Sequence, residues 1–506
     1  MKSTKILALL LAVLMLLATA LAGCSKDDGK SNKPGADVIE ETEVDQSGVY
    51  DAKVHDLHGH EFYFLARSTT HQHLQVNEIY AEEQTGDKIN DAVFKRNSQL
   101  EEKYNCKIIQ DMNDDPATAV REQLLAGEYQ YDFLYTRTSD LRRLSASNLL
   151  VDFKQLDNVD LSKAWWDQNA IEGLGIAGKA YYVMGSAGTM DERASWAIYF
   201  NKDYVDQAGL DSPYGLVKEG KWTIDKMVEY MNATAQDTNG DGVMEIGVDR
   251  FGYVGEPLNN WMHVAACNCR LSNISSSGDI ELPGTVNKDV LAAWAALKPL
   301  LTSDLRNVTD NGGFSNGKCT FYGCLSGVIF NISKKEVNWG ILPLPKLNEE
   351  QEEYWTSINI GWCYSYGIPT TTELTPDYEE NGFESGQEQA GYFLEAFSYY
   401  SVGTLQTAYV DQVVKYQVAK DADSAEMIEL ALKNKVYDPV VLYNFGRIGT
   451  AIFSEAGSAG GMSDGKGTPA KGSDVNYDTL VSLYESRLNA ARKELNKYIE
   501  NVTVDD

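Results

Sequence analysis

Residues 131–136 read YDFLYT, and this apolar run is typical of a short strand buried inside a sheet. A similar run at 61–66, EFYFLA, predicts another strand. Between the two strands, apolar side chains recur at helical spacing over 88–105, and after them Leu141 and Leu144 begin a further helix. This alternation of strands and helices predicts an α/β fold.

The charge of the chain excludes some classes of protein. Among its 506 residues, 44 Lys and Arg stand against 74 Asp and Glu, which gives a formal charge of −30. Nucleic-acid binding needs a basic surface that displaces counterions, and adhesion to anionic lipid needs clustered cations. We therefore expect no nucleic-acid partner and no binding to lipid head groups by surface charge.

The first residues have the pattern of an export signal. Two lysines precede an apolar run over 6–22, which ends in Leu-Ala-Gly-Cys at 21–24. This order is typical of a secretory signal peptide, here over 1–23, and Cys24 occupies the place of the acylated cysteine in the lipobox of bacterial lipoproteins. A plain signal peptide with a chance cysteine and an uncleaved anchor helix are the alternatives. We expect a lipid anchor, such as palmitate, on Cys24 that holds the protein at the extracytoplasmic face of the cell membrane.

The segment 24–49 is rich in Ser, Lys, Gly, Asp and Glu and poor in aromatic residues, so it is expected to be a flexible tether. No later stretch is long and apolar enough to span a bilayer. Six cysteines follow Cys24, and their spacing matches no zinc or redox motif. They are expected to be buried apolar side chains, with at most one disulfide.

Short motifs follow one another in a fixed order through the body of the chain. They are DFLY at 132–135 with NLLVD at 148–152, KAYYV at 179–183 with AIYFNKD at 197–203, AGLD at 208–211 with WTIDK at 222–226, GKC at 317–319, and GILPLP at 340–345. In content and order they resemble the extracellular solute-binding proteins of ABC importers, in the family that includes maltose-binding protein. The resemblance covers most of 55–500.

The resemblance implies a two-lobed fold of the periplasmic-binding-protein type II, with a hinge that closes the lobes around a ligand in the cleft. It assigns 50–190 and 314–358 to one lobe, and 191–313 and 359–506 to the other. It also implies a binding protein without catalysis, an oligosaccharide as the small-molecule ligand and an ABC permease as partner. We expect a monomer that requires no cofactor.

Residues 256–261, EPLNNW, make the most informative site prediction. They are similar to a family segment whose Glu bonds sugar hydroxyls and whose Trp stacks on a sugar face, and Glu256 and Trp261 match those two. Charge-assisted acceptors suit sugar hydroxyls, and flat aromatic rings suit the apolar faces of a sugar. Leu258 replaces a family aromatic residue. The alternative is that Trp261 begins a core helix.

The loop after 131–136 falls where the family contacts its ligand from the opposing lobe, so Thr136, Arg137 and Ser139 are candidates. Thr136 and Ser139 replace a family Trp and Asp, and the ligand therefore need not be maltose. Arg137 can grip a hydroxyl or a carboxylate, or it can form a surface salt bridge. Further candidates, from the end of the first strand and from the two crossing segments, are Arg67, Asp191, Trp196 and Trp362.

The segment 237–245, DTNGDGVME, has the spacing of a calcium loop. The expected ligands are Asp237, Asn239, Asp241, Glu245 and the carbonyl of Val243. Val248 stands where such loops carry a bidentate Glu, so a remote carboxylate such as Asp249 has to help. A structural Ca²⁺ and a plain Asp/Gly turn are both open.

Two other functions compete with sugar capture. Five of the six histidines lie within 55–73, which raises zinc uptake as an alternative, but the resemblance places this region on a first hairpin and its loop, and the spacing matches no defined zinc motif. An exported glycan-active enzyme would need two carboxylates at a set separation, and the sequence has no GxSxG, HExxH or Walker pattern in a suitable place. A binding protein for another polar solute, such as a peptide or an acidic glycan, is a further alternative.

Overall fold

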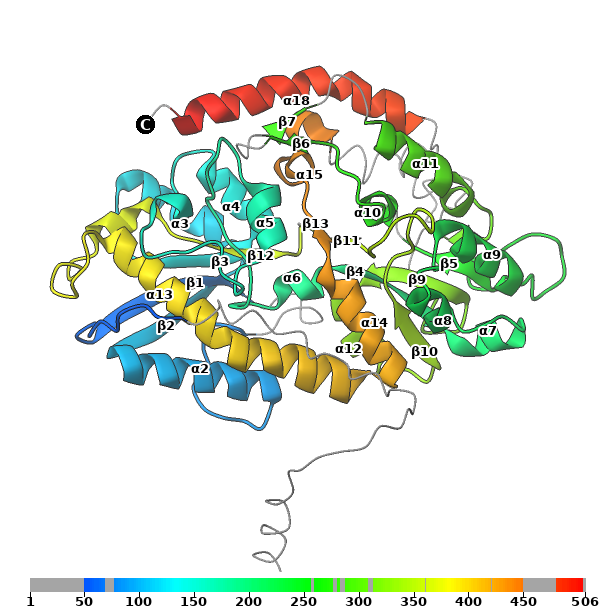
Figure 1. Cartoon of the computed structure of the whole chain (residues 1–506), viewed down its shortest axis with the longest axis horizontal. Helices are drawn as coiled ribbons and strands as arrows, with labels where there is room; N and C mark the ends of the chain where they lie inside the picture. Colours follow the sequence, from blue (N-terminus) through cyan, green and yellow to red (C-terminus); the bar gives the residue numbers. More distant parts are fainter. Residues whose placement is uncertain are drawn as a thin grey trace, which may run out of the picture. The chain divides into compact units, whose positions relative to one another are not determined.

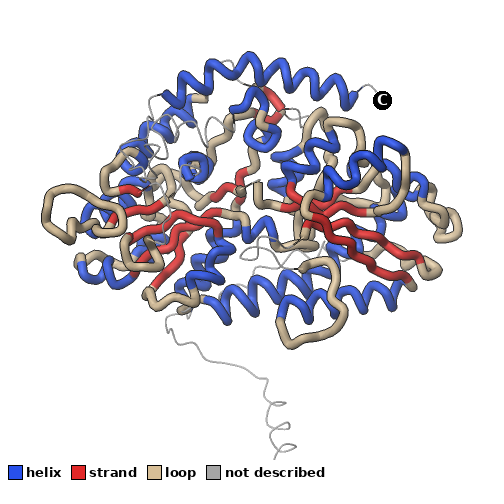
Figure 2. Tube along the Cα trace, turned by 180° about the vertical axis from the view of Figure 1, so that it is seen from behind, coloured by secondary structure: helices blue, strands red, loops and turns tan. Residues whose placement is uncertain are grey.

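The computed structural model describes residues 50–68, 77–255, 259–275, 280–282, 287–307, 313–359, 361–419, 421–448 and 479–503. In these residues the chain is a mixed α/β protein built on two main sheets (Figure 1). Figure 2 shows the two groups of strands apart from each other, each with helices around it. The expected α/β class with two lobes is therefore confirmed.

The first sheet has four strands in the order β12-β3-β1-β2. These strands are β1 (His60–Arg67), β2 (Cys106–Asn113), β3 (Phe133–Arg137) and β12 (Tyr364–Gly367). β1 is parallel to β2 and β3, whereas β12 runs antiparallel to β3. The carboxyl ends of β1 and β3 therefore lie at the same edge of the sheet as the amino end of β12.

Helices cover both faces of this sheet, as expected for strands that are almost continuously apolar. Those that pack on its strands are α2 (Lys88–Tyr104), α3 (Pro116–Ala126), α4 (Thr138–Ser145) and α13 (Gly386–Ser401). Next to α4 lie α15 (Pro439–Tyr443), which also contacts α5 (Gln168–Leu174), and α18 (Thr479–Thr503), whose Tyr498 bonds to Ser145. The core between the sheet and α13 is aromatic, and the ring centroids of Phe62 and Phe393 are 3.8 Å apart. In α18, the side chains of Leu488, Ala491 and Leu495 are buried, so this helix has one apolar face turned to the core.

The second sheet has five strands in the order β10-β4-β9-β5-β8. These strands are β4 (Trp196–Asn201), β5 (Phe251–Val254), β8 (Arg306–Asn307), β9 (Cys319–Leu325) and β10 (Trp339–Leu342). All six residues of β4 are buried, and this strand pairs with β10 on one side and with β9 on the other. The helices near this sheet are α7 (Lys202–Gln207), α8 (Pro213–Lys218), α9 (Ile224–Thr234), α10 (Asn259–Ala266), α11 (Lys288–Leu301), α12 (Ile329–Ile332) and α14 (Ala422–Lys433).

Several segments connect the two sheets. α6 (Met190–Arg193) leads directly into β4, and β11 (Thr356–Ser357) pairs in parallel with β13 (Lys435–Val436). The hydroxyl of Thr356 donates a hydrogen bond to the backbone oxygen of Trp196 at 2.7 Å, which ties two of these crossings together. A fourth connection is α13, which continues as the π-helix η5 (Val402–Val418) and contacts α14.

The strand pairing corrects the expected division of the chain. Residues 314–358 were expected beside 50–190, but β9 and β10 both pair with β4 in the second sheet. Conversely, β12 and α13 were expected beside 191–313, but they pair and pack with the first sheet. The physical reason is that β9 bonds to β4 on one side and to β5 on the other, and only long-range pairing reveals this.

Within the described ranges, no helix combines the length and the apolar character needed to cross a membrane. The six cysteines beyond Cys24 all lie in described residues, and none of them forms a disulfide. Five of them are buried, as expected for small apolar side chains. Cys24 itself lies outside the described residues.

Candidate functional site

Polar side chains gather where the first sheet ends. Arg67 is the last residue of β1 and Arg137 the last of β3, while Tyr364 begins β12 directly opposite Arg137 in the register. α4 starts immediately after β3 and carries Asp140 in its first turn. In an open α/β sheet, the carboxyl ends of the strands are the usual place for a ligand.

The charged groups at this edge are only partly paired with one another. Nη1 of Arg67 lies 3.5 Å from Oδ2 of Asp140, and both side chains are largely enclosed, at 11% and 14% exposure. Oδ1 of the same Asp140 lies 3.0 Å from Nη2 of Arg143 on the surface. The guanidinium carbon of Arg137 stands 5.6 Å from the ring centroid of Trp362, a cation–π distance.

Five buried polar atoms at this edge have no hydrogen-bond partner in the described part of the chain. They are Nε of Arg67, Oγ1 of Thr136, Nε of Arg137, Oδ2 of Asp140 and the hydroxyl of Tyr364. We call these five residues the edge site. Most buried polar atoms in folded proteins are hydrogen-bonded, so such a concentration marks a place where a solute or water completes the bonding.

Tyr364 acts as a neutral donor in the edge site. Burial raises the pKa of its hydroxyl to about 12, although the cations Arg67 and Arg137 lower that pKa in part. Its ring lies 5.4 Å from the ring of Tyr135, whose own hydroxyl donates to Oε2 of Glu78 at 2.5 Å. A narrow pocket lined by Arg67, Glu78, Tyr135 and Tyr364 opens here.

A glycine permits the close packing behind this pocket. A Cβ atom on Gly188 would lie 2.4 Å from the hydroxyl of Tyr135 and 3.2 Å from Oε2 of Glu78. Glu78 also accepts the backbone N–H of Thr189 at 3.1 Å. The wall of the pocket is therefore fixed by hydrogen bonds that leave no room for a side chain at 188.

A second polar group lies on the segments that connect the sheets, and we call it the crossing cluster. It consists of Asp167, Asp191, Glu192 and Lys435, whose side chains are buried or nearly so. Nζ of Lys435 is 2.7 Å from Asp191, 3.4 Å from Asp167 and 3.9 Å from Glu192. One ammonium group thus bridges a residue at the start of α5, two residues of α6 and β13.

The charges of the crossing cluster are set by burial and by these contacts. Burial by itself would lower the pKa of Lys435, but the three carboxylates outweigh it and raise that pKa well above its ordinary value. Burial and the neighbouring Asp191 raise the pKa of Glu192 well above its ordinary value. For Asp191 the effect of Lys435 outweighs burial and lowers the pKa. The cluster therefore favours the charged forms of Lys435 and Asp191 and disfavours ionisation of Glu192.

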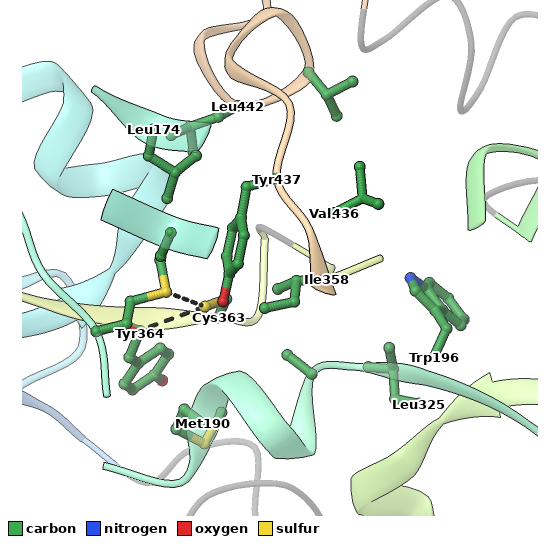
Figure 3. Packing of buried hydrophobic residues seen from close by; sticks show 14 of the residues in the cluster. Leu174, Met190, Trp196, Leu325, Ile358, Cys363, Tyr364, Val436, Tyr437 and Leu442 are labelled. Atoms are coloured by element: carbon green, nitrogen blue, oxygen red, sulfur yellow. Dashed lines mark hydrogen bonds between the residues drawn. The ribbon is translucent and has the colours of Figure 1, made fainter. Parts of the chain in front are cut away.

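Cys363 and Tyr437 connect the two polar groups (Figure 3). The hydroxyl of Tyr437 donates to Oδ2 of Asp167 at 2.6 Å, and its ring lies beside Cys363. The backbone oxygen of Cys363 accepts the N–H of Thr138 at 3.0 Å, and Tyr364 follows Cys363 in the chain. Cys363, which directly precedes Tyr364 of the edge site, therefore lies near the crossing cluster as well.

The structure brings only part of the predicted site together. Arg67, Thr136, Arg137 and Trp362 lie at the edge of the first sheet. Ser139 lies in the first turn of α4, where its backbone oxygen accepts Nε of Arg142 at 3.2 Å.

The other predicted site residues lie elsewhere. Asp191 binds Lys435 in the crossing cluster instead of standing free. Trp196 is 6% exposed in β4 and Trp261 is 2% exposed near the start of α10, so both are core residues here. This burial favours the alternative that Trp261 begins a core helix. Glu256 lies outside the described residues.

Sequence reasoning missed Tyr364, Asp140 and Lys435 as parts of these groups. Tyr364 follows the predicted Trp362 by two positions, and Asp140 ends the predicted loop, so both were within reach of a local argument. Lys435 carries no motif, and its partner Asp191 is 244 positions away in the chain.

The predicted calcium loop is closed by its own side chains. Asp237 accepts the backbone N–H groups of Gly240 and Gly242, both at 2.7 Å, and Asp241 accepts that of Val243 at 2.8 Å. Both oxygens of Asp249 accept backbone N–H groups of the loop. The side chain of Asn239 donates to the other oxygen of Asp241 at 3.0 Å, so the loop has a defined shape in which its carboxylates accept bonds from the loop itself.

The predicted zinc histidines have other partners. His60 lies 2.8 Å from Asp377, whereas His55 and His58 both bond to Asn381. His71 and His73 lie outside the described residues. Among the residues that the structure describes, no three or more His, Cys, Asp or Glu gather in a way that could hold a metal ion.

A larger cavity, of about 700 Å³, lies away from the edge site. Its walls include Lys154 and Glu172 near α5 on one side, and Arg270, Asn273 and Asn287 on the other. None of the predicted site residues lines this cavity.

The sequence matches the model of a known protein family. The family described as bacterial extracellular solute-binding protein matches residues 98–373, more than half of the chain. No curated protein sequence matches. Among solved structures, an ABC substrate-binding protein from Listeria monocytogenes in complex with cycloalternan aligns over 87% of this chain and 99% of its own, with 14% identity and a TM-score of 0.49. The GacH receptor of Streptomyces glaucescens, solved unliganded and with acarbose, aligns over 87% and 98%, with 11% identity and a TM-score of 0.46.

The family match covers β2, β3 and β12 of the first sheet, the first crossing at α6, and all five strands of the second sheet. It therefore includes both the edge site, apart from Arg67, and most of the crossing cluster. The chain belongs to the bacterial extracellular solute-binding proteins.

Proposed function

We propose that this protein is the substrate-binding component of an ABC importer and that it captures an oligosaccharide between its two lobes. The protein is a monomer that works by binding and release, without catalysis, and delivers the ligand to the permease. Differential affinity of the closed and open states for the ligand is sufficient for this work.

The edge site is the observation that carries the proposal. It combines hydroxyl, guanidinium and carboxylate groups whose buried atoms lack partners, and an aromatic ring, that of Trp362, stands beside Arg137. Sugar hydroxyls both donate and accept hydrogen bonds, so they can complete such a mixed set, and a sugar face can pack on an indole. The motifs that resemble sugar-binding members of the family support the same ligand class.

A thermal-shift panel tests the ligand class. The purified protein without its first 23 residues is heated with mono- and oligosaccharides, and with short peptides in a parallel series. An oligosaccharide is expected to raise the melting temperature, because a ligand that binds only the folded state stabilises it by mass action. A shift with peptides and none with any saccharide would contradict the proposal.

The same mixtures also test the alternative of a glycan-active enzyme. Chromatography of the saccharides after long incubation is expected to recover them unchanged. Conversion of a bound saccharide into product would show an enzyme instead of a transport receptor.

The membrane anchor is proposed at Cys24, through an acyl chain added after cleavage of the signal peptide. Members of an extracellular family work outside the cytoplasm, and a lipid holds such a protein near its permease. Labelling of cells with a palmitate analogue should mark the wild-type protein and leave a Cys24→Ser variant unmarked. Release of the variant into the medium should accompany the loss of the label.

A structural Ca²⁺ is proposed in the loop of Asp237, Asn239, Asp241, Val243 and Glu245. The expected result is a melting temperature that rises with Ca²⁺ and falls with a chelator. An Asp241→Asn variant should lose this dependence, whereas the matched surface variant Asp225→Asn should keep it. Equal calcium responses of the two variants would argue for a plain turn.

A further inference from the structure

The charges of the edge site narrow the ligand class further. We propose that the edge site binds an anionic group of its saccharide ligand, the carboxylate of a uronic acid or a sulfate ester, between Arg67 and Arg137. This inference rests on the proposed function, because it concerns the same site and the same ligand.

Arg67 and Arg137 share one carboxylate at this edge, that of Asp140, because the carboxylate of Glu78 in the pocket wall is bonded to Tyr135 and Thr189 instead. Arg67 shares its counter-ion, because one oxygen of Asp140 pairs with Arg67 and the other oxygen pairs with Arg143. Arg137 has the ring of Trp362 as its neighbour, and no carboxylate in the described part of the chain forms an ion pair with it. A buried or half-buried cation without a counter-charge is unfavourable, so this arrangement favours an anionic ligand.

The free atoms of the two arginines have the geometry that anions use. A guanidinium group binds a planar carboxylate or a sulfate through two parallel N–H donors, and Nε belongs to one such pair. Nε of Arg67 and Nε of Arg137 are both buried and both lack a hydrogen-bond partner within the described residues. Tyr364, whose hydroxyl lacks a partner among the described residues, adds a neutral donor near both cations.

The start of α4 adds a favourable dipole. This helix has eight residues and begins directly after Arg137, and no side chain caps its first turn. The N–H of Thr138 is taken up by the backbone oxygen of Cys363, but the positive end of the helix dipole still favours a negative charge at this end. Asp140 in the first turn cancels part of this effect, but it is itself engaged by two arginines.

Two matched pairs of probes test the inference by calorimetry. Trigalacturonate is compared with its methyl ester, and a sulfated chondroitin disaccharide with the unsulfated one. The wild-type protein should bind at least one charged probe about 10- to 100-fold more tightly than its counterpart, as expected for hydrogen bonds between charged groups. The preference should shrink only in part between about 0.1 M and about 1 M NaCl, because salt screens enclosed charges less than exposed ones.

Variants of Arg137 connect the preference to the edge site. Arg137→Gln should abolish the preference for the charged probe, and Arg137→Lys should keep part of it, because the charge remains while the paired donors are lost. Arg121→Gln removes the same charge from the exposed surface of α3 and should leave the preference unchanged. Equal melting temperatures of the free variants show that the fold is intact.

The outcomes separate this inference from the proposed function. If neutral oligosaccharides bind and the charged probes bind no better, the anionic group is refuted while sugar capture stands. A preference that survives Arg137→Gln would also refute it. If no saccharide of either kind binds and peptides do, both proposals fail.

Discussion

The edge site and the crossing cluster are neighbours, and both hold buried charges, yet their charges are satisfied in opposite ways. In the crossing cluster, one ammonium group, that of Lys435, meets three carboxyl groups within 3.9 Å. In the edge site, Arg137 faces an aromatic ring, and five buried polar atoms lack partners within the described residues.

This difference separates buried charges that stabilise the fold from buried polar atoms that are available to a ligand. A buried charge that the protein itself neutralises fixes the relative position of the segments that carry it. A buried polar atom that the protein leaves open is unfavourable for stability until a ligand arrives. Mutations in the crossing cluster should therefore change the stability of the fold, whereas mutations in the edge site should change binding.

The largest effect is expected from Lys435→Met. Removal of the ammonium group leaves Asp167 and Asp191 without a counter-charge in a buried place, and the free energy of unfolding should fall by about 3–5 kcal/mol. Urea unfolding followed by circular dichroism measures the change. Lys433→Met is the matched control, because Lys433 makes only an exposed pair with Glu353 at 3.6 Å and should matter by less than about 1 kcal/mol. Similar losses in the two variants would break the comparison.

Glu395 tests how burial affects an acid that has hydrogen-bond donors but no ion pair with a cation among the described residues. Its two oxygens accept the indole N–H groups of Trp165 and Trp166, each at 3.0 Å. Burial raises the pKa of Glu395 to about 8, against the lowering effect of the two indoles. The folded state therefore holds a proton that the unfolded state releases between pH 4.5 and about 8, and stability falls as the pH rises through this range.

Glu395→Gln removes this titration. Its stability relative to the wild type should improve by roughly 2–4 kcal/mol from pH 5 to pH 8, whatever the variant loses in hydrogen bonding at both values. Urea unfolding of both proteins across the range measures this difference. A constant difference would show that Glu395 is ionised in the folded protein over the whole range.

The smallest changes in stability should come from two buried tyrosines, one beside the crossing cluster and one in the edge site. Their Phe variants compare the two regions directly. Tyr437→Phe removes a 2.6 Å bond to Asp167 and should lower the free energy of unfolding by about 1–3 kcal/mol. Tyr364→Phe removes a hydroxyl without a partner and should change stability by less than about 0.5 kcal/mol, but it should weaken ligand binding. Unfolding and calorimetry of both variants test this, and the reverse pattern would exchange the roles assigned to the two regions.

Much of the fold could be predicted because its signals are local. The apolar runs of β1 and β3 and the helical spacing in α2 lie within short windows, and the caps of α2 are read from the same window: Asp87 caps its start and Asn105 ends it with a φ of 50°. The edge site was predicted in part for the same reason, since Arg67 and Arg137 directly follow recognisable strands.

Strand pairing and side-chain burial could not be predicted from short stretches of the sequence. The assignment of β9 and β12 to their sheets depends on hydrogen bonds to strands far away in the chain. The burial of Trp261 depends on what packs over α10, and an aromatic residue beside polar ones has the same local pattern in a core and in a cleft.

The sequence by itself determined the α/β class, the order of the elements, the family resemblance and the residues that end the strands of the first sheet. It could do so because hydrophobic period, turn residues and motif order are properties of neighbouring residues. The tertiary structure alone decided that Lys435 meets Asp191 and that the partners of Arg137 remain incomplete. Pairing and burial are properties of distant segments brought together, and the free energy of a charge depends on that surrounding more than on the residue that carries it.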